Sequence, residues 1–181
     1  DMSQQEKEME EIDKSEEERD NVRNSLESYI FKLKNALERD SVDFFDPSMI
    51  DEYKQLTGEV ENWFYENEFE RHSAKKYNKI LQKLKDIGDP AFKRQKSREN
   101  LPLIVNRIID RAEKCNQSLS KRNIDDVDEA NQIKFELDQI VTEVEKMKNE
   151  LQSIPCYLDM AIDEDYFNNE LCRIEKIIQS Y

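Results

Sequence analysis

The stretch that decides the fold is Val22–Leu37 (VRNSLESYIFKLKNAL). Six of its large apolar residues are separated by four, three, one, three and four positions, which places all six on one face of an α-helix: Val22, Leu26, Tyr29, Ile30, Leu33 and Leu37. No glycine or proline interrupts the stretch, so the helix can continue backward through the acidic residues before it. The pattern predicts the core helix of a bundle.

The composition of the whole chain favours an all-α fold. Its 181 residues include only two glycines and four prolines, which leaves little material for hairpins, and 39% of its residues are charged. This length is enough for one domain with a real core and an appended piece. We therefore predict an all-α helical bundle.

Outward from Val22–Leu37, the sequence predicts five more helices, over about 47–67, 73–88, 90–120, 126–153 and from 163 onward. Asp46-Pro47 and Asp89-Pro90 each combine an N-cap residue with a proline at the first helical position. Gly88 is expected to end the third helix, and Gly58 to let another helix approach closely. Pro102 predicts a kink or short break near Asn100–Leu101. Lys121–Asp126 is expected to be a polar connection.

The first residues of the chain are too polar to be core. Ten of the first twenty residues are acidic and three are basic, and Met2, Met9 and Ile12 stand nearly alone as large apolar residues. A helix continuous to Arg39 would be about 58 Å long, more than a compact bundle needs. We predict three segments: a projecting acidic helical arm over 1–21, a core bundle over 22–120, and additional C-terminal helices over 121–181.

The net charge of −14 is unevenly distributed. Residues 1–70 carry 8 basic and 22 acidic groups, residues 71–122 carry 15 and 5, and residues 123–181 carry 5 and 15. Either the basic middle segment packs between its acidic neighbours, or it exposes a basic face to an acidic partner. The net charge gives no long-range attraction to nucleic acid or anionic membranes.

The sequence holds little catalytic chemistry. His72 is the only histidine, so a histidine-based triad has no second candidate, and the Glu68–His72 pair falls short of a metal-binding bundle. Neither glycine belongs to a phosphate-binding loop. Three cysteines without metal-ligand spacing, Cys115, Cys156 and Cys172, are expected to be buried residues of a reduced protein. We predict no catalytic, cofactor-binding or metal-binding residue, and a chain that is not an enzyme.

Several segments resemble the heat shock protein 70 superfamily. Asn24–Phe31 (NSLESYIF) is similar to the segment where the lid helix of these chaperones enters the C-terminal helical bundle, and Glu61–Glu66 (ENWFYE) resembles Glu-Asn-Trp-Leu-Tyr-Glu of the heat shock protein 110 branch. Tyr77, Lys83–Lys85, Gly88–Pro90 and Arg98–Pro102 also resemble that branch, whereas Asn67–Glu70 replaces its acidic-Gly-acidic turn. The resemblance covers most of residues 8–120. Trp63 is expected to be the buried aromatic anchor of the bundle.

The resemblance implies the C-terminal substrate-binding lid of a large stress-response chaperone, whose ATPase domain and peptide-binding β-sandwich are not in this sequence. It implies packing against those domains, docking on a heat shock protein 70 partner during nucleotide exchange, and help in binding unfolded clients. The implied compartment is the cytoplasm. The endoplasmic-reticulum lumen is the alternative, and Asn116-Gln117-Ser118 is a glycosylation sequon.

An unrelated helical scaffold or protein-interaction bundle is the alternative class. A spectrin-like array would repeat at a period near 100 residues, and the sequence shows no such repeat.

We predict that the isolated chain neither binds nor hydrolyses ATP, because it has no phosphate-binding loop. Isothermal titration calorimetry with magnesium and ATP should give no binding heat, and stoichiometric binding would overturn the assignment of this region as non-catalytic.

Overall fold

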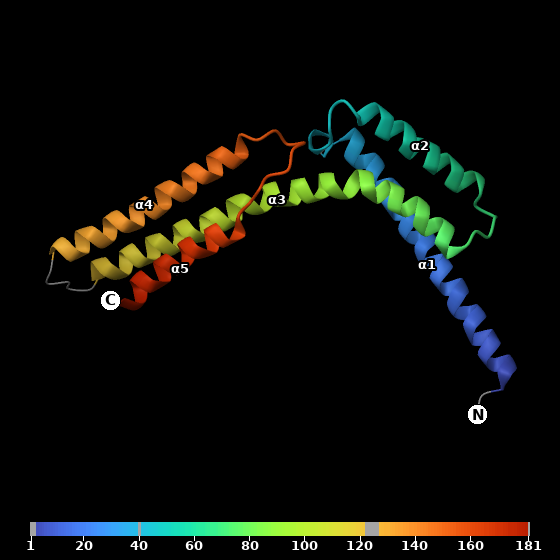
Figure 1. The fold of residues 1–181 in the computed structure, drawn as a ribbon, viewed down its shortest axis with the longest axis horizontal. Helices are drawn as coiled ribbons and strands as arrows, with labels where there is room; N and C mark the ends of the chain where they lie inside the picture. The colour runs from blue at the N-terminus through green and yellow to red at the C-terminus, as the bar shows by residue number, and fades with distance from the viewer. Residues whose placement is uncertain (1–2, 40, 122–126, 181) are drawn as a thin grey trace. The chain divides into compact units, whose positions relative to one another are not determined.

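The computed structural model describes residues 3–39, 41–121 and 127–180. Its helices are α1 (Gln4–Glu38), the short 3-10 helix η1 (Val42–Phe44), α2 (Ile50–Glu66), α3 (Ala74–Lys121), α4 (Val127–Gln152) and α5 (Glu164–Ser180) (Figure 1). The described residues contain no strand, so the predicted all-α class is confirmed.

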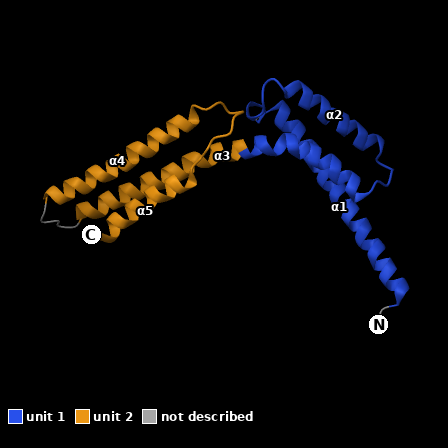
Figure 2. Ribbon diagram, in the orientation of Figure 1, with its two compact units in different colours: residues 1–93 blue, residues 94–181 orange. Residues whose placement is uncertain are grey.

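The chain forms two compact units, residues 1–93 and residues 94–181 (Figure 2). Helix α3 contributes its first part to the first unit and its later part to the second. The sequence-based division placed the core bundle at 22–120. In the structure, buried residues from Leu101 to Leu119 instead share a hydrophobic cluster with α4 and α5.

The first unit is built on α1, α2 and the first part of α3. As predicted, the apolar face of Val22–Leu37 is buried: Leu26, Ile30, Leu33 and Leu37 are each at most 2% exposed. Phe64 of α2, together with Tyr77, Leu81 and Leu84 of α3, joins the same cluster. Phe45, which follows η1, is also in this cluster. The α1 helix is therefore held at its C-terminal half.

The N-terminal half of α1 makes few contacts within its own unit. The helix begins with a capping box, in which the Ser3 hydroxyl accepts a hydrogen bond from the Glu6 amide while the Glu6 carboxylate accepts one from the Ser3 amide. Met9 and Ile12 are 65% and 58% exposed. This part of α1 extends beyond α2 and the start of α3 (Figure 1), as expected for a projecting arm.

The predicted helix end at Gly88 is wrong, and of the kink or short break predicted near Asn100–Leu101 the break does not occur. Helix α3 is continuous from Ala74 to Lys121, and Gly88 has a negative φ. Two prolines, Pro90 and Pro102, therefore lie inside a helix, where each costs about 3 kcal/mol relative to alanine. Burial of α3 on either side of them offsets that cost, because Leu84 and Ala91 are core residues of one unit and Leu101 and Val105 are core residues of the other: all four are at most 1% exposed.

The close helix approach predicted for Gly58 is found at Gly88 instead. A Cβ atom on Gly58 would meet nothing within 4 Å, so the close approach expected there is absent. A Cβ atom on Gly88 would lie 2.5 Å from Tyr29 Oη and 3.2 Å from Leu33 Cδ1. Gly88 therefore allows α1 to approach α3. Asp89 is no N-cap, because α3 continues through it, and its carboxylate accepts the hydrogen bond of the Tyr29 hydroxyl at 2.5 Å.

The predicted start of α2 at Pro47 is also wrong. Asp46 accepts hydrogen bonds from the Ser48 amide at 2.9 Å and the Ser48 hydroxyl at 2.7 Å, which closes a turn in place of a helix cap. Helix α2 then begins at Ile50, with Met49 as its N-cap residue.

Trp63 is partly buried and packs against the core of the first unit, so the buried aromatic anchor that the sequence predicted is found there only in part. Its neighbour Phe64 is 3% exposed and takes that place in the core. Successive residues of a helix point about 100° apart, and α2 turns Phe64 inward. The Trp63 ring instead lies against the His72 ring, with their centroids 5.2 Å apart.

The second unit packs α4 and α5 on the later part of α3. The predicted helices over 126–153 and from 163 are confirmed as α4 and α5, and the Asp163 carboxylate caps α5 by accepting from the Tyr166 amide at 3.1 Å. Arg98 of α3 donates to the Ile154 and Pro155 carbonyls, which follow α4. The polar connection predicted at 121–126 lies, from residue 122 on, outside the described residues.

We predict that Gly88→Ala destabilises the protein, because the added methyl group would displace Tyr29, whereas Gly58→Ala stabilises it by about 1 kcal/mol through helix propensity. Overpacking typically costs about 1–3 kcal/mol, so Gly88→Ala should lower the free energy of unfolding despite the same propensity gain. Urea denaturation measures both variants.

A double-mutant cycle isolates the contact. In a Tyr29→Phe background the atom nearest to the new methyl group is gone, so Gly88→Ala should cost less than it does in the wild-type protein. An equal cost in both backgrounds would show that Tyr29 does not set the limit at Gly88.

We predict that hydrogen exchange protects the amides of residues 24–37 strongly and those of residues 4–15 weakly in dilute solution. The early helix persists because it continues from a packed segment, which removes the cost of nucleation, yet little burial holds it. Strong and equal protection along all of α1 in a demonstrated monomer would mean that the arm packs on its own chain.

Candidate functional site

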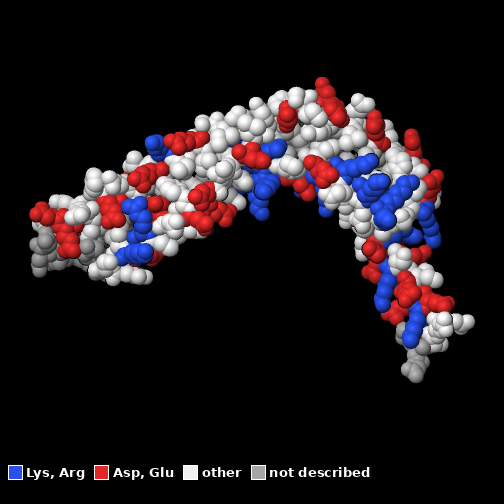
Figure 3. Space-filling view, in the orientation of Figure 1, with Lys and Arg blue, Asp and Glu red and all other residues white. Residues whose placement is uncertain are grey.

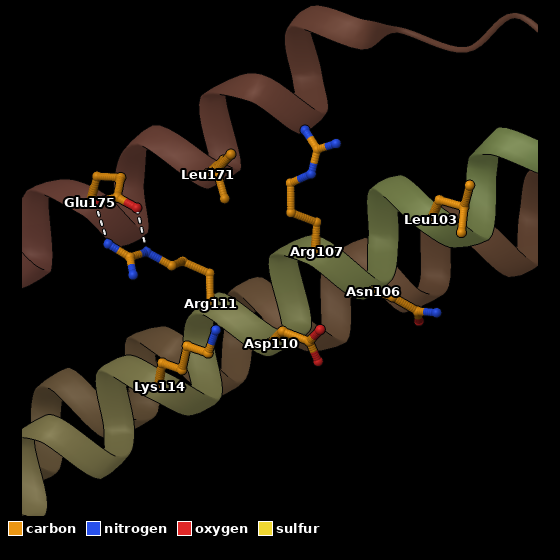
Figure 4. A pocket seen from close by; sticks show the side chains of 8 residues that line it. All are labelled: Leu103, Asn106, Arg107, Asp110, Arg111, Lys114, Leu171 and Glu175. Atoms are coloured by element: carbon orange, nitrogen blue, oxygen red, sulfur yellow. Dashed lines mark hydrogen bonds and ion pairs between the residues drawn. The ribbon is translucent and has the colours of Figure 1, made fainter.

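The second unit has a groove of about 520 Å³ along the surface between α3 and α5 (Figure 4). Six lining residues recur at helical spacing on α3 and two come from α5: Leu103, Asn106, Arg107, Asp110, Arg111, Lys114, Leu171 and Glu175. A spacing of three and four residues places the α3 set on one side of that helix. The groove is therefore formed by two straight helix faces.

An ion pair joins the two sides of the groove. Arg111 Nε lies 2.5 Å from Glu175 Oε1 and its Nη2 donates to Oε2 at 2.9 Å, a bidentate geometry that fixes both side chains. The hydrogen bond and charge of Arg111 hold the pKa of the Glu175 carboxyl below its usual value. This pair uses one of the three cations that line the groove.

Arg107 and Lys114 have no ion-pair partner among residues 3–39, 41–121 and 127–180, and both are exposed. Leu103, at one end of the groove, is 63% exposed. The groove thus presents two free cations and an apolar side chain. It is equipped to bind by charge and contact, and its lining residues include no paired nucleophile and base of the kind that catalysis requires.

A second groove, of about 680 Å³, lies in the first unit between α1 and α3. Its α1 side consists of amides, hydroxyls and one lysine within the Val22–Leu37 helix and just before it: Asn21, Asn24, Ser25, Ser28, Tyr29 and Lys32. Leu81 and Lys85 form the α3 side. Burial and the hydrogen bond to Asp89 raise the pKa of the Tyr29 phenol, so Tyr29 remains a hydrogen-bond donor.

His72 takes a structural position. Lys76 Nζ lies 3.2 Å from the His72 Nδ1 atom, and the His72 Nε2 atom lies 3.2 Å from a Glu70 carboxylate oxygen without the geometry of a hydrogen bond. The described residues contain no group of three or more metal-binding side chains.

The cysteines are less buried than predicted. Cys115 is buried, Cys156 is partly buried and Cys172 is exposed, so the expectation of three buried cysteines is wrong for Cys172. No described helix is long and apolar enough to cross a membrane.

No site residue was predicted from the sequence, and neither groove was. The α3 side of the first groove has a signal in the sequence, because Leu103, Arg107 and Arg111 recur every four residues. The α5 side has none, because Glu175 meets Arg111 across 64 residues of sequence.

The described residues form an all-α protein with open grooves on its surface. Comparison with known proteins finds a similar segment in heat shock protein 110 of Caenorhabditis elegans, 30% identical over 91 residues. The similarity covers 50% of this chain and 12% of that relative, so the chain corresponds to a small part of the relative's length. No family model matches the chain. No solved structure matches it either.

We predict that Glu175→Gln lowers the melting temperature at pH 7, because it removes the charge that Arg111 faces. Because the pKa of the Glu175 carboxyl is lowered in the folded state, its ionised form stabilises the fold at pH values above the ordinary carboxyl pKa of 4.5. This stabilisation is lost as the pH falls through the lowered pKa. The difference between wild type and variant should therefore disappear in acid.

Thermal denaturation followed by circular dichroism between pH 3 and pH 7 measures this difference. Glu145→Gln is the matched control, because Glu145 is exposed on α4 and no ion pair involves it among the described residues. Equal effects of the two variants at pH 7 would contradict a role for the Arg111 pair.

Proposed function

We propose that this chain is the C-terminal helical lid region of a heat shock protein 110-type chaperone. In this role it assists the binding of unfolded clients and docks on a heat shock protein 70 partner during nucleotide exchange, without catalysis of its own. The proposal places the parent protein in the cytoplasm.

The observation that carries the proposal is the 30% identity to heat shock protein 110 of C. elegans over half of this chain. The segments that resemble the family, Asn24–Phe31 and Glu61–Glu66, lie on α1 and α2 of the first unit. They contribute Ile30 and Phe64 to one hydrophobic cluster. The resemblance therefore falls on residues that build a common core.

The arm adds an argument from burial. Ile12, Glu16 and Arg19 of the arm follow one another at helical spacing on the side of α1 that continues into Arg23 and Leu26. Arg23 covers the Phe64 ring at 4.7 Å and Leu26 is fully buried, whereas Ile12 is 58% exposed. Glu16 and Arg19 are partly buried, and Glu16 pairs with Arg71, so the packed face of α1 loses its cover at Ile12. In the proposed chaperone, the β-sandwich domain covers it.

A chimera tests the proposal. A heat shock protein 110 whose own lid region is replaced by this chain should keep a heat-denatured model enzyme soluble and should accelerate nucleotide release from a heat shock protein 70. The control carries an unrelated helical bundle of equal length. A chimera that performs no better than this control in both assays would sink the proposal.

A helical interaction scaffold unrelated to chaperones is the second candidate. The observation that favours it is the second unit, which has its own core and a cationic groove, while the similarity to the chaperone covers half of the chain. The chimera separates the two candidates, because a scaffold would not restore either activity.

A further inference from the structure

The first turns of α3 carry a basic stretch of the sequence. Residues 74–85 (AKKYNKILQKLK) contain five lysines and no acidic residue. Their apolar members Tyr77, Leu81 and Leu84 face the core and are at most 7% exposed. The lysines are left on the outer faces, and Figure 3 shows basic side chains gathered over this part of the first unit.

Three of these lysines form a row that we call the lysine face: Lys75, Lys79 and Lys83. Residues four apart lie on neighbouring turns of one helix side, about 6 Å apart along the axis. All three are exposed, and none has a hydrogen bond or ion pair within the described ranges 3–39, 41–121 and 127–180. Asp86, one turn beyond Lys83, is held by Gln82 at 2.8 Å.

The acidic residues of the first unit do not neutralise this face. Glu61 of α2 pairs with Lys34 of α1 at 2.9 Å, and Glu16 of the arm pairs with Arg71 at 3.1 Å, just before α3. Like charges at this spacing on a helix repel each other by a few tenths of a kcal/mol per pair. Repulsion within the lysine face therefore destabilises the isolated chain, and no ion pair among the described residues offsets it.

We propose that the lysine face is a docking site for an acidic helix of a separate partner protein, which presents carboxylates four residues apart. Two helices that lie side by side with the same repeat bring each carboxylate opposite one ammonium group. The proposal does not depend on the chaperone assignment.

The surroundings favour an acidic helix over a membrane or a nucleic acid. The exposed residues between the lysines are Asn78 and Gln82, so the face offers no apolar side chain for insertion into a bilayer. It also offers no exposed aromatic ring for stacking on bases and no arginine fork.

The test uses the full chain and a fluorescent, alanine-based helical peptide that carries glutamate at every fourth position. Fluorescence anisotropy should show binding that weakens as salt is raised. The variant K75E/K79E/K83E should weaken binding at least tenfold. The control K121E/K134E/K176E makes the same change in net charge at exposed lysines outside the two grooves and should leave the affinity within twofold.

The outcomes separate the proposal from its competitors. Equal weakening by both triple variants, or equal binding of a peptide with its glutamates scattered around the helix, would reduce the effect to net charge and overturn the proposal. Tighter binding of a single-stranded RNA or of anionic vesicles would also overturn it. So would sedimentation showing that the wild-type chain is a dimer that the K75E/K79E/K83E variant abolishes, because a second copy would then occupy the face.

Circular dichroism must show that the variants fold. If K75E/K79E/K83E is unfolded, K75A/K79A/K83A replaces it, because alanine keeps the helix and removes the charge. Undiminished binding by the alanine variant would refute the lysine face as the site.

Discussion

The first unit depends on the close approach of α1 and α3 at Gly88. The Tyr29 hydroxyl occupies the space where a side chain at position 88 would begin, and it donates to Asp89, the next residue of α3. The Tyr29 ring meets Phe92 edge to face, and Phe92 meets Phe45 in the same way. Phe45 in turn contacts Tyr53 of α2. One small residue thus lets a chain of aromatic contacts join all three helices of the unit.

This constraint explains why local sequence signals mislead at Gly88-Asp89-Pro90. Glycine, aspartate and proline in that order ordinarily end one helix and begin another. Here all three residues lie inside the continuous helix α3. Gly88 provides space and Asp89 accepts a hydrogen bond, while Pro90 is followed directly by the buried Ala91. Tyr29 and Asp89 are 60 residues apart. A contact at that distance cannot be read from a local pattern, because nothing in the pattern says which helices are neighbours.

The features that could be predicted from the sequence are those that depend on a single helix. The buried face of Val22–Leu37 and the extents of α4 and α5 follow from periodicity, which each helix carries in itself. Which of the two rings, Trp63 or Phe64, is buried depends on the side of α2 that meets the neighbouring helices. The larger ring, Trp63, is therefore not the more buried one. The groove beside Arg111 is a property of α3 and α5 together. Its ion pair closes only when the fold brings Glu175 alongside.

The net charge can be counted from the sequence, but which charged residues pair with one another depends on how the helices pack. In the second unit, basic residues act as cross-links: Arg111 binds Glu175, and Arg173 of α5 lies 3.7 Å from Glu136 and 4.0 Å from Glu143 of α4. At the start of α3, the lysines repel one another, and burial of Tyr77, Leu81 and Leu84 beneath them keeps the helix in place. Exposed ion pairs contribute little to stability, so the folded core can carry an unneutralised face at small cost. A protein with a net charge of −14 can therefore hold a local cationic surface, and that surface, not the total, determines what it attracts at short range.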